Sequence, residues 1–394
     1  MTCRKEINAH LVISDSIKLV NKEHWDSISA DRNLYLSRPY LEGLEEGMEN
    51  GMEFRYVIYY CEKYTPIGIA YFQSVLLEDK GSPYRDRVQR LGERIGSRAM
   101  KEMKARILVN GNVFQCGENG YLFDERLSRE EILEMLSETL ERLKGDEEMA
   151  QRPTFLMFKE VRKGSIEPTS EILKKKGYHH LHMDLNMCLH VDQGWDGLDG
   201  YLQALTSKAR TRVKRIMKLS KDLEIESLDT EAIRKELARI DELFEYILDG
   251  SEFQFGRLDM AVYAEWKERL GDDFIFRAYR IDGRMVGFST AFRHDGFMEA
   301  QYVGYDPELN RSHSIYQRML IQYLQDAMEK GVLNLNLGRT AEQAKSSLGA
   351  VPVDMMLYVK HRNMIANKLI RPILSSVHPS EFEQRSPFKQ AVHN

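Results

Sequence analysis

Polar residues within the apolar segment 297–305 (FMEAQYVGY) are the side chains of this chain best suited to move protons. Alternation along a strand predicts one face formed by Phe297, Glu299, Gln301, Val303 and Tyr305, and another formed by Met298, Ala300 and Tyr302. If helices cover both faces, Glu299 is a carboxylate in an apolar layer, where burial without partners raises a carboxyl pKa. Such a group can act as a general base toward an amine, with Tyr302 or Tyr305 as the acid. The alternative is that Glu299 lies on a solvated face or pairs with an arginine.

A second set of candidates surrounds the start of the next helix. We expect residues 306–313 (DPELNRSH) to form a loop, and apolar spacing predicts a helix over 314–330. Ser314 and Gln317 match a capping box at its start. Because a helix N-terminus favours anions, the expected binders of a phosphate are Arg311, Ser312, His313 and Ser314. The alternative is an ordinary helix start, since no glycine lets the backbone close around a pyrophosphate.

The segment that follows, 332–338 (VLNLNLG), predicts a short strand with its leucines facing the core. Asn336 would then face the other way and could hydrogen-bond an amide-bearing ligand or cap a strand edge. Arg339 and Lys345, in GRTAEQAKSSLG, could bind anions near the end of the sheet. Gln301 could bind a polar group of the substrate. Solvated surface cations are the alternative for Arg339 and Lys345.

Similar elements occur twice along the chain, which predicts two lobes. Two strand pairs, 55–77 and 274–293, share one pattern, and the Asp282-Gly283 dipeptide favours a tight hairpin in the second. Later helix–strand units place Gly145 opposite Gly331 and Gly177 opposite Gly349, with extra residues in the first copy at 78–104. The fold class is therefore α/β (α+β), with mixed central sheets flanked by helices.

A cluster of Asp, Gly and Trp in 191–200 (VDQGWDGLDG) predicts the boundary between the lobes. We expect a first lobe over 1–190, a second lobe with the main motifs over 191–375, and a loosely ordered tail over 376–394. Apolar periodicity predicts long helices over 198–220 and 230–248 in the second lobe. Seven basic residues and no acid fall between Lys208 and Lys221. This face, with Lys208 and Arg210, could be solvated, bind cofactor phosphates or grip an RNA backbone such as that of tRNA.

Composition sets limits on the class of protein. The 394 residues are 42% apolar and 30% charged with a net charge of −5, as expected for a folded soluble protein without a general affinity for nucleic acid. No segment resembles a signal peptide or a membrane span, and four scattered cysteines fit a reducing cytoplasm, although association with a membrane surface stays open. GxSxG and Walker motifs do not occur. The histidines of 179–190 match no standard zinc spacing, so we expect no metal site.

The second half of the chain resembles a known superfamily. GYDPELNRSHSIYQRMLIQYLQDAMEKG followed by LNLGRTAEQAKSSLGA is similar to the GNAT-type acyltransferases, and most similar to their Fem-like branch, in which two such lobes are fused. YLQALTSKARTRVKRIMKL is similar to the helix that opens the second lobe of those proteins, and YLSRPYLEGLEE to the opening helix of the first. The resemblance covers residues 30–365, with motif content at 200–215 and 285–360.

The resemblance implies tandem GNAT-like lobes and a metal-independent transfer of an acyl group from an acyl-coenzyme A thioester to an amine. Small-molecule, sugar and lipid-linked amines are the implied acceptors. Coenzyme A would place its pyrophosphate at 310–314, where this chain lacks the glycines of the family pattern. Aminoacyl-tRNA as donor for peptidoglycan precursor synthesis is one alternative, and a non-catalytic ligand-binding protein is another. In the catalytic case, neighbouring strands of the sheet must separate beside Glu299 to admit the thioester.

Overall fold

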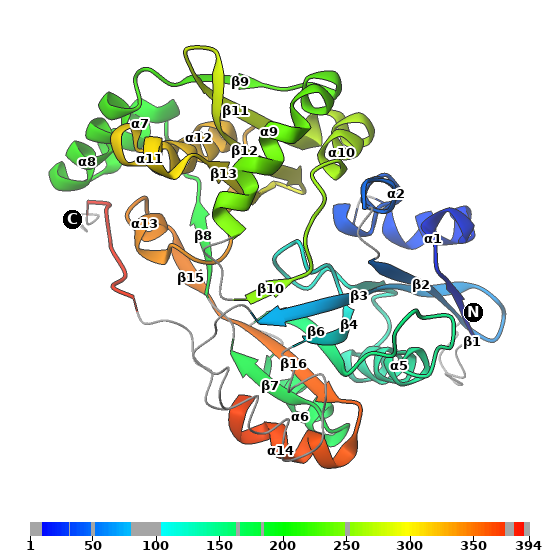
Figure 1. Ribbon diagram of the computed structural model, residues 1–394. Helices are drawn as coiled ribbons and strands as arrows, with labels where there is room; N and C mark the ends of the chain where they lie inside the picture. Colours follow the sequence, from blue (N-terminus) through cyan, green and yellow to red (C-terminus); the bar gives the residue numbers. More distant parts are fainter. Residues whose placement is uncertain are drawn as a thin grey trace. The chain divides into compact units, whose positions relative to one another are not determined.

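The computed structural model describes residues 10–30, 32–48, 52–79, 104–162, 166–182, 185–248, 253–374 and 382–389. The chain divides into two compact units (Figure 1). Unit 1 comprises Met1–Met183, Ser251–Asp259 and Asp354–Pro379, and unit 2 comprises Asp184–Gly250, Met260–Val353 and Ser380–Asn394. Each unit contains a mixed sheet with flanking helices, which confirms the predicted fold class.

Unit 1 contains a nine-stranded sheet in the order β1-β2-β3-β4-β6-β16-β7, with β5 and β10 paired to β3. Its strands are β1 His10–Ser14, β2 Glu53–Tyr60, β3 Pro66–Asp79, β4 Lys104–Asn110, β5 Tyr121–Phe123, β6 Phe155–Arg162, β7 His179–His182, β10 Phe253–Phe255 and β16 Met355–His361. Its α-helices are α1 Lys22–Ser29, α2 Arg38–Gly47, α5 Arg129–Leu143, α6 Ile166–Lys175 and α14 Met364–Leu374. Leu136 of α5 and Leu173 of α6 join the core on one face, and Trp25 of α1 packs edge-on against Tyr56 on the other.

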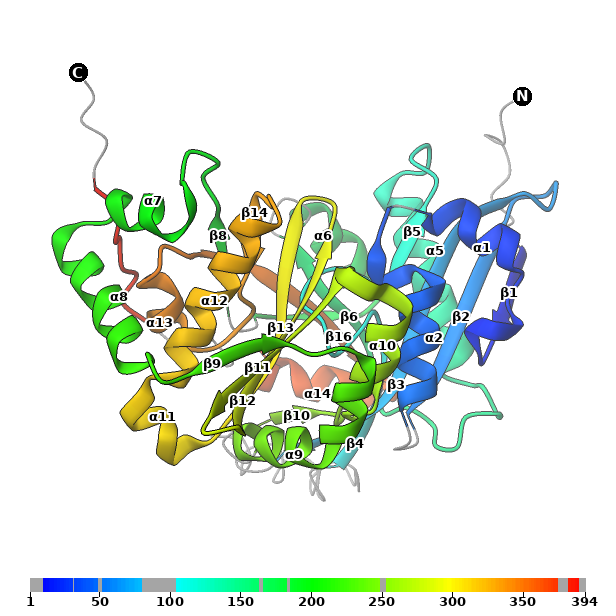
Figure 2. The ribbon, with the colours of Figure 1, turned by 90° about the horizontal axis from the view of Figure 1, so that it is seen from above.

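Unit 2 contains a seven-stranded sheet in the order β15-β8-β14-β13-β12-β11-β9. Its strands are β8 Asn186–His190, β9 Glu224–Ser227, β11 Phe274–Ile281, β12 Arg284–His294, β13 Phe297–Tyr305, β14 Asn334–Asn336 and β15 Val351–Val353. Its α-helices are α7 Gly197–Ala204, α8 Ser207–Leu219, α9 Thr230–Leu248, α10 Val262–Leu270, α11 Pro307–His313, α12 Ile315–Glu329 and α13 Glu342–Ser346. Helices α7, α8 and α12 share a core with one sheet face, and α9 and α10 pack against β11, β12 and β13 (Figure 2).

The two units exchange segments of the chain, so a single boundary near residue 190 does not divide them. Strand β8 precedes that boundary but pairs with β14 and β15 in unit 2. Strand β16 lies within the predicted second lobe but pairs with β6 and β7 in unit 1. Residue patterns indicate which segments form strands, but they carry no local signal of which distant strands pair with each other. The pairing of β8 in unit 2 and of β16 in unit 1 was therefore not predicted.

Several predicted elements are confirmed. The pairs β2–β3 and β11–β12 are antiparallel hairpins, and Asp282 and Gly283 both have positive φ (49° and 74°), as a tight two-residue turn requires. Helix α9 has the predicted bounds, and so does strand β13. The extra residues expected at 78–104 lie mostly outside the described residues.

The helix predicted over 198–220 is two helices, α7 and α8. Thr206 ends the continuity because its side chain accepts a hydrogen bond from the backbone N–H of Ala209 and caps α8. Leu205 has extended backbone and forms a β-bridge with Phe388. The apolar periodicity continued across this break, which is why one helix was predicted.

The tail, predicted to be loosely ordered, is packed over 382–389. Thr206 N–H donates to the carbonyl oxygen of Pro387 (2.8 Å), and Lys389 N–H donates to that of Ala204 (3.0 Å). The ring of Phe388 stacks on Trp195 with centroids 5.6 Å apart and contacts Tyr201 edge-on. Phe382 packs against the same core, so two aromatic residues anchor a segment whose composition predicted disorder.

Candidate functional site

Strands β13 and β14 separate within the sheet of unit 2. They pair in parallel over Phe297–Glu299 and Asn334–Asn336. Past Asn336 the chain follows β8 instead, since Leu337 N–H donates to the carbonyl oxygen of Met187 (2.8 Å) and Met187 N–H donates to that of Gly338 (3.0 Å). Strand β13 continues to Tyr305 alongside β12. The two strands therefore diverge directly beyond the Glu299–Asn336 pair.

A β-bulge lies in β13 just past this divergence. Ser289 opposes Val303 and Ala291 opposes Ala300, so Gln301 and Tyr302 together oppose Thr290. The Thr290 hydroxyl accepts a hydrogen bond from Tyr302 N–H (3.2 Å) and lies 3.2 Å from Gln301 Oε1. Thr290 is fully buried, so its side chain is placed to hold the bulge.

The bulge corrects the predicted alternation of β13. Met298, Ala300, Val303 and Tyr305 face the side of α12, whereas Tyr302 packs against Phe244 of α9. The prediction had Val303 and Tyr305 on the face of Glu299. Strict alternation fails because one extra residue in a strand shifts every later side chain to the opposite face. A threonine opposite two polar residues was the available signal, and it is a weak one.

Glu299 is buried, at 6% exposure, on the sheet face that α9 and α10 cover. Its neighbour across the strand pair is Phe292, which packs against Trp266 of α10. The imidazole Nε2 of His294 lies 3.6 Å from Glu299 Oε1, so a histidine lies beside this carboxylate. A carboxylate in this apolar setting is well placed to accept a proton.

Asn336 lies beside Glu299 at the divergence. The two residues are register partners, so their side chains share a face. Asn336 is buried, and its Oδ1 accepts a hydrogen bond from Gly338 N–H (2.9 Å). Its Nδ2 group is the end of the side chain that can address a ligand carbonyl. Gln301, on β13 with Glu299, provides a second amide side chain. Its buried Nε2 has no hydrogen-bond partner among the described residues.

The two candidate acids lie on opposite faces of β13. Tyr302 shares the α9 side with Glu299, while Tyr305 contacts Tyr316 of α12 at 5.8 Å between ring centroids. Burial raises the pKa of Tyr305 above its ordinary value near 10. The phenol is therefore protonated at neutral pH and can donate.

The segment before α12 is a helix and not the predicted loop. Asp306 caps α11 by accepting hydrogen bonds from the N–H groups of Glu308 and Leu309, and Pro307 occupies its first turn. The Asp-Pro pair was the missed signal. Ser314 joins α11 to α12 in the left-handed region (φ 51°), and the expected capping box is wrong because its side chain makes no cap hydrogen bond. Asn310 Oδ1 instead accepts from Tyr316 N–H (2.9 Å).

The expected anion binders gather at this junction. Arg311 and Ser312 are exposed, and His313 Nδ1 lies 2.8 Å from the Ser312 hydroxyl. Helix α8 packs against α11 and α12, so its basic residues belong to an element next to this junction (Figure 2). Several basic residues of α8, and one just after it, are exposed and make no ion pair with any described residue. They are Lys208, Lys214, Arg215, Lys218 and Lys221.

Three other candidates have structural contacts. Arg210 donates from Nε to the carbonyl oxygen of Leu202 (2.8 Å) and from Nη2 to that of Leu205 (3.1 Å), and so closes the end of α7. Lys345 is buried and donates to the carbonyl oxygen of Arg339 (2.5 Å). These contacts give Arg210 and Lys345 a role in the fold, and Arg339, whose carbonyl group accepts from Lys345, is half-buried.

Unit 1 also contains a pair of parallel strands, but a loop of the chain packs against the end of one of them. Strands β4 and β6 are parallel over Ile107–Asn110 and Phe155–Phe158. In the loop after β4, Gly117 N–H donates to Glu160 Oε2 (2.5 Å), and Lys159 Nζ donates to the carbonyl oxygen of Gln115. Lys159 and Glu160 are themselves a buried ion pair. Because this loop lies against the end of β6, unit 2 is the better candidate for the site.

The described residues contain no group of three or more His, Cys, Asp or Glu side chains arranged to hold a metal ion. Within the same described ranges, no helix has the length and apolar character needed to cross a bilayer.

Residues 207–346 match the family model described as acetyltransferase (GNAT) domain. The whole chain has the fold of FemX, with a TM-score of 0.54 at 12% identity over 90% of this chain and 98% of that one. Residues 207–346 therefore form a GNAT domain, and the chain as a whole has a two-lobed fold like that of FemX. A tandem GNAT protein from the clavulanic acid biosynthesis pathway has a similar fold, with a TM-score of 0.50 at 9% identity, over 90% of this chain and 99% of that one. No curated protein matches the sequence.

Proposed function

We propose that this chain is an N-acyltransferase that moves an acyl group from an acyl-coenzyme A thioester to a primary amine. The observation that carries the proposal is the divergence of β13 and β14 directly beside the buried carboxylate of Glu299. A thioester lying between the strands would present its carbonyl carbon near Glu299, Gln301 and Asn336.

Two parts of the donor, the coenzyme A phosphates and the thioester carbonyl group, have candidate binding residues in unit 2. Phosphates of coenzyme A would lie near the α11–α12 junction, with Arg311, His313 and the cations of α8 as counter-charges. The Nε2 donor of Gln301 lacks a partner among the described residues, and it could hydrogen-bond the oxygen that becomes negative during attack.

The chemistry then needs one base and one acid. The amine nitrogen bonds to the carbonyl carbon and passes its proton to Glu299, directly or through His294. Collapse of the tetrahedral intermediate breaks the carbon–sulfur bond. Tyr302 or Tyr305 protonates the departing thiolate, the proton on Glu299 is released to solvent, and the tyrosinate takes up a proton from solvent.

Calorimetric titration with acetyl-coenzyme A and longer acyl-coenzyme A thioesters tests the donor. We expect binding that weakens when Arg311 is changed to Ala, because a phosphate loses a counter-charge. Absence of binding at every chain length would remove coenzyme A as the donor. Binding with full affinity in Arg311→Ala would instead move the phosphate site away from α11.

The exposed cations of α8 support aminoacyl-tRNA as an alternative donor. Lys214 and Arg215 project from a helix without acidic residues, and their charges are not neutralised by described neighbours. An extended basic face suits a nucleic-acid backbone as well as it suits a cofactor. In either case we propose that the enzyme works in the cytoplasm, where both donors occur.

The exposed surface of helix α14 in unit 1 supports a lipid-linked amine as the acceptor. Helix α14 exposes Met364 (79%) and Ile365 (72%) beside Lys368 and Arg371. Apolar side chains next to cations are typical of helices that rest on an anionic bilayer surface. Sedimentation with phosphatidylglycerol vesicles should bring down the protein, but not its Met364→Ser/Ile365→Ser form. Equal sedimentation of both, or equal binding to phosphatidylcholine vesicles, would argue for a soluble acceptor.

A further inference from the structure

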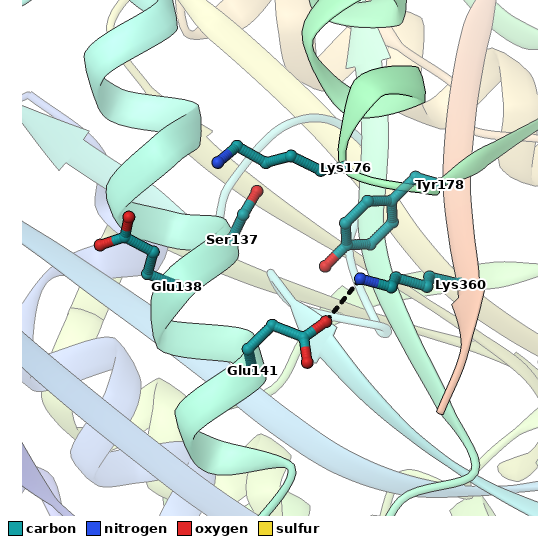
Figure 3. A pocket seen from close by; sticks show the side chains of 6 residues that line it. All are labelled: Ser137, Glu138, Glu141, Lys176, Tyr178 and Lys360. Atoms are coloured by element: carbon teal, nitrogen blue, oxygen red, sulfur yellow. Dashed lines mark hydrogen bonds and ion pairs between the residues drawn. The ribbon is translucent and has the colours of Figure 1, made fainter. Parts of the chain in front are cut away.

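A groove of about 350 Å³ on unit 1 lies apart from every residue assigned above (Figure 3). Helix α5 forms one side, the turn after α6 another, and β16 the third. The lining side chains are those of Ser137, Glu138, Glu141, Lys176, Tyr178 and Lys360. This volume is near the lower end of the range of sites for small organic ligands, about 300–1,000 Å³.

Two hydroxyl groups of the groove lack hydrogen-bond partners. Ser137 is 4% exposed and Tyr178 is 2% exposed. Neither Oγ of Ser137 nor the phenol oxygen of Tyr178 has a partner among the described residues. Figure 3 shows both hydroxyls in the space between α5 and the strands. Buried polar groups are nearly always paired, so two unpaired hydroxyls lining one groove indicate a missing ligand group.

The two cations of the groove differ in how closely they are paired. Glu141 is neutralised by Lys144 and by Lys360, whose Nζ lies 2.6 Å from Oε1. Lys360 also lies over the Tyr178 ring, 5.4 Å from its centroid. Lys176 Nζ is 3.9 Å from the exposed Glu134, and Figure 3 shows Glu138 directed away from the hydroxyls.

Tyr178 is a donor at physiological pH. Burial, followed by the charge of Glu141, raises the pKa of its phenol far above the ordinary value near 10. The hydroxyl proton is therefore retained. With the Ser137 hydroxyl and the Lys176 ammonium, the groove offers three donors and no free acceptor of similar burial among its described lining residues.

We propose that this groove binds a small organic anion, and that Ser137, Lys176 and Tyr178 hold its carboxylate or phosphate group. Hydroxyl and ammonium donors suit either oxyanion. The volume beyond one oxyanion accommodates the carbon skeleton of the ligand. The site is independent of the acyl-transfer proposal, since every residue in it belongs to unit 1.

Titrations of the full chain with inorganic phosphate and with succinate test this site by heteronuclear NMR. We expect one of the two to bind with a dissociation constant of millimolar order or tighter, and to shift signals of residues 137 and 178. Tyr178→Phe and Ser137→Ala should each weaken binding about tenfold, the effect of one charge-assisted hydrogen bond. Lys175→Gln, on an exposed neighbour outside the groove, should bind as the parent does. Phosphate alone would identify a phosphorylated ligand, and succinate alone a carboxylate.

Failure of both anions to bind, or equal binding by the parent and Tyr178→Phe, would overturn the proposal. Thermal unfolding without ligand gives a second test. Tyr59 is the matched control, because its equally buried hydroxyl lies 2.7 Å from that of Thr139. Tyr59→Phe should lower Tm, whereas Tyr178→Phe should leave it unchanged or raise it. A lowered Tm in Tyr178→Phe would mean that its hydroxyl is bonded within the protein, which also contradicts the proposal.

Discussion

Replacement of Glu299 by Gln tests the proposed base at its centre. The change conserves size at a site that is 6% exposed, so stability should change by less than about 1 kcal/mol. A primary amine with a pKa of about 10.4 is unprotonated in roughly four molecules in ten thousand at neutral pH. Loss of the group that removes the proton should therefore lower kcat/KM by about 10²–10³, or about 3–4 kcal/mol.

The assay is release of free thiol from acetyl-coenzyme A in the presence of a panel of primary amines. In Glu299→Gln the remaining rate should rise about tenfold per pH unit until the amine loses its proton without help. Glu308→Gln, an exposed acid on α11, is the matched control and should match the parent. Undiminished turnover in Glu299→Gln would refute the role of this carboxylate. If His294→Gln produces the same loss, the proton passes through the imidazole, 3.6 Å away.

Three further outcomes are expected. If tRNA is the donor, Lys214→Glu and Arg215→Glu should each weaken its binding about tenfold in low salt and flatten the salt dependence in a gel-shift assay, whereas indifference to both would exclude α8 as the contact. Phe388→Ala should lower stability by about 2 kcal/mol and Tm by roughly 4–8 °C in calorimetry, because the half-buried ring packs on Trp195, and an unchanged Tm would mean that the tail does not bind in solution. Burial lowers the pKa of His361 below its usual 6.5, so the unfolded chain takes up the proton first and stability should fall as pH drops from 7 to 5. His361→Asn should reduce that fall in thermal melts, and an identical pH dependence would assign it to other groups.

Local patterns predicted most of the elements and much less of their geometry. The Asp282-Gly283 turn and helix α9 follow from neighbouring residues, so the sequence was sufficient. The break at Thr206 is made by the cap of α8, and periodicity could not reveal it because the apolar spacing continues across the break. Asp306-Pro307 was a readable start signal for α11 that favoured a helix over the predicted loop.

For the candidate site too, the sequence predicted some features and could not predict others. Glu299 and Asn336 were singled out by residue type, and the strand register brings them side by side. The bulge at Gln301 and Tyr302 depends on hydrogen bonds to Thr290 of the neighbouring strand, so alternation placed Tyr305 on the wrong face. Arg210 was selected for its charge, but its contacts with α7 carbonyl groups depend on where α7 ends.

The position of β16 between β6 and β7 has a consequence for biosynthesis. A ribosome that has made residues 1–183 has synthesised both neighbours of an absent strand, and 206 positions separate Phe155 from its register partner His361. The nascent chain must keep two open sheet edges from aggregating until β16 has been synthesised. Early termination would therefore damage the half of the protein that was synthesised first.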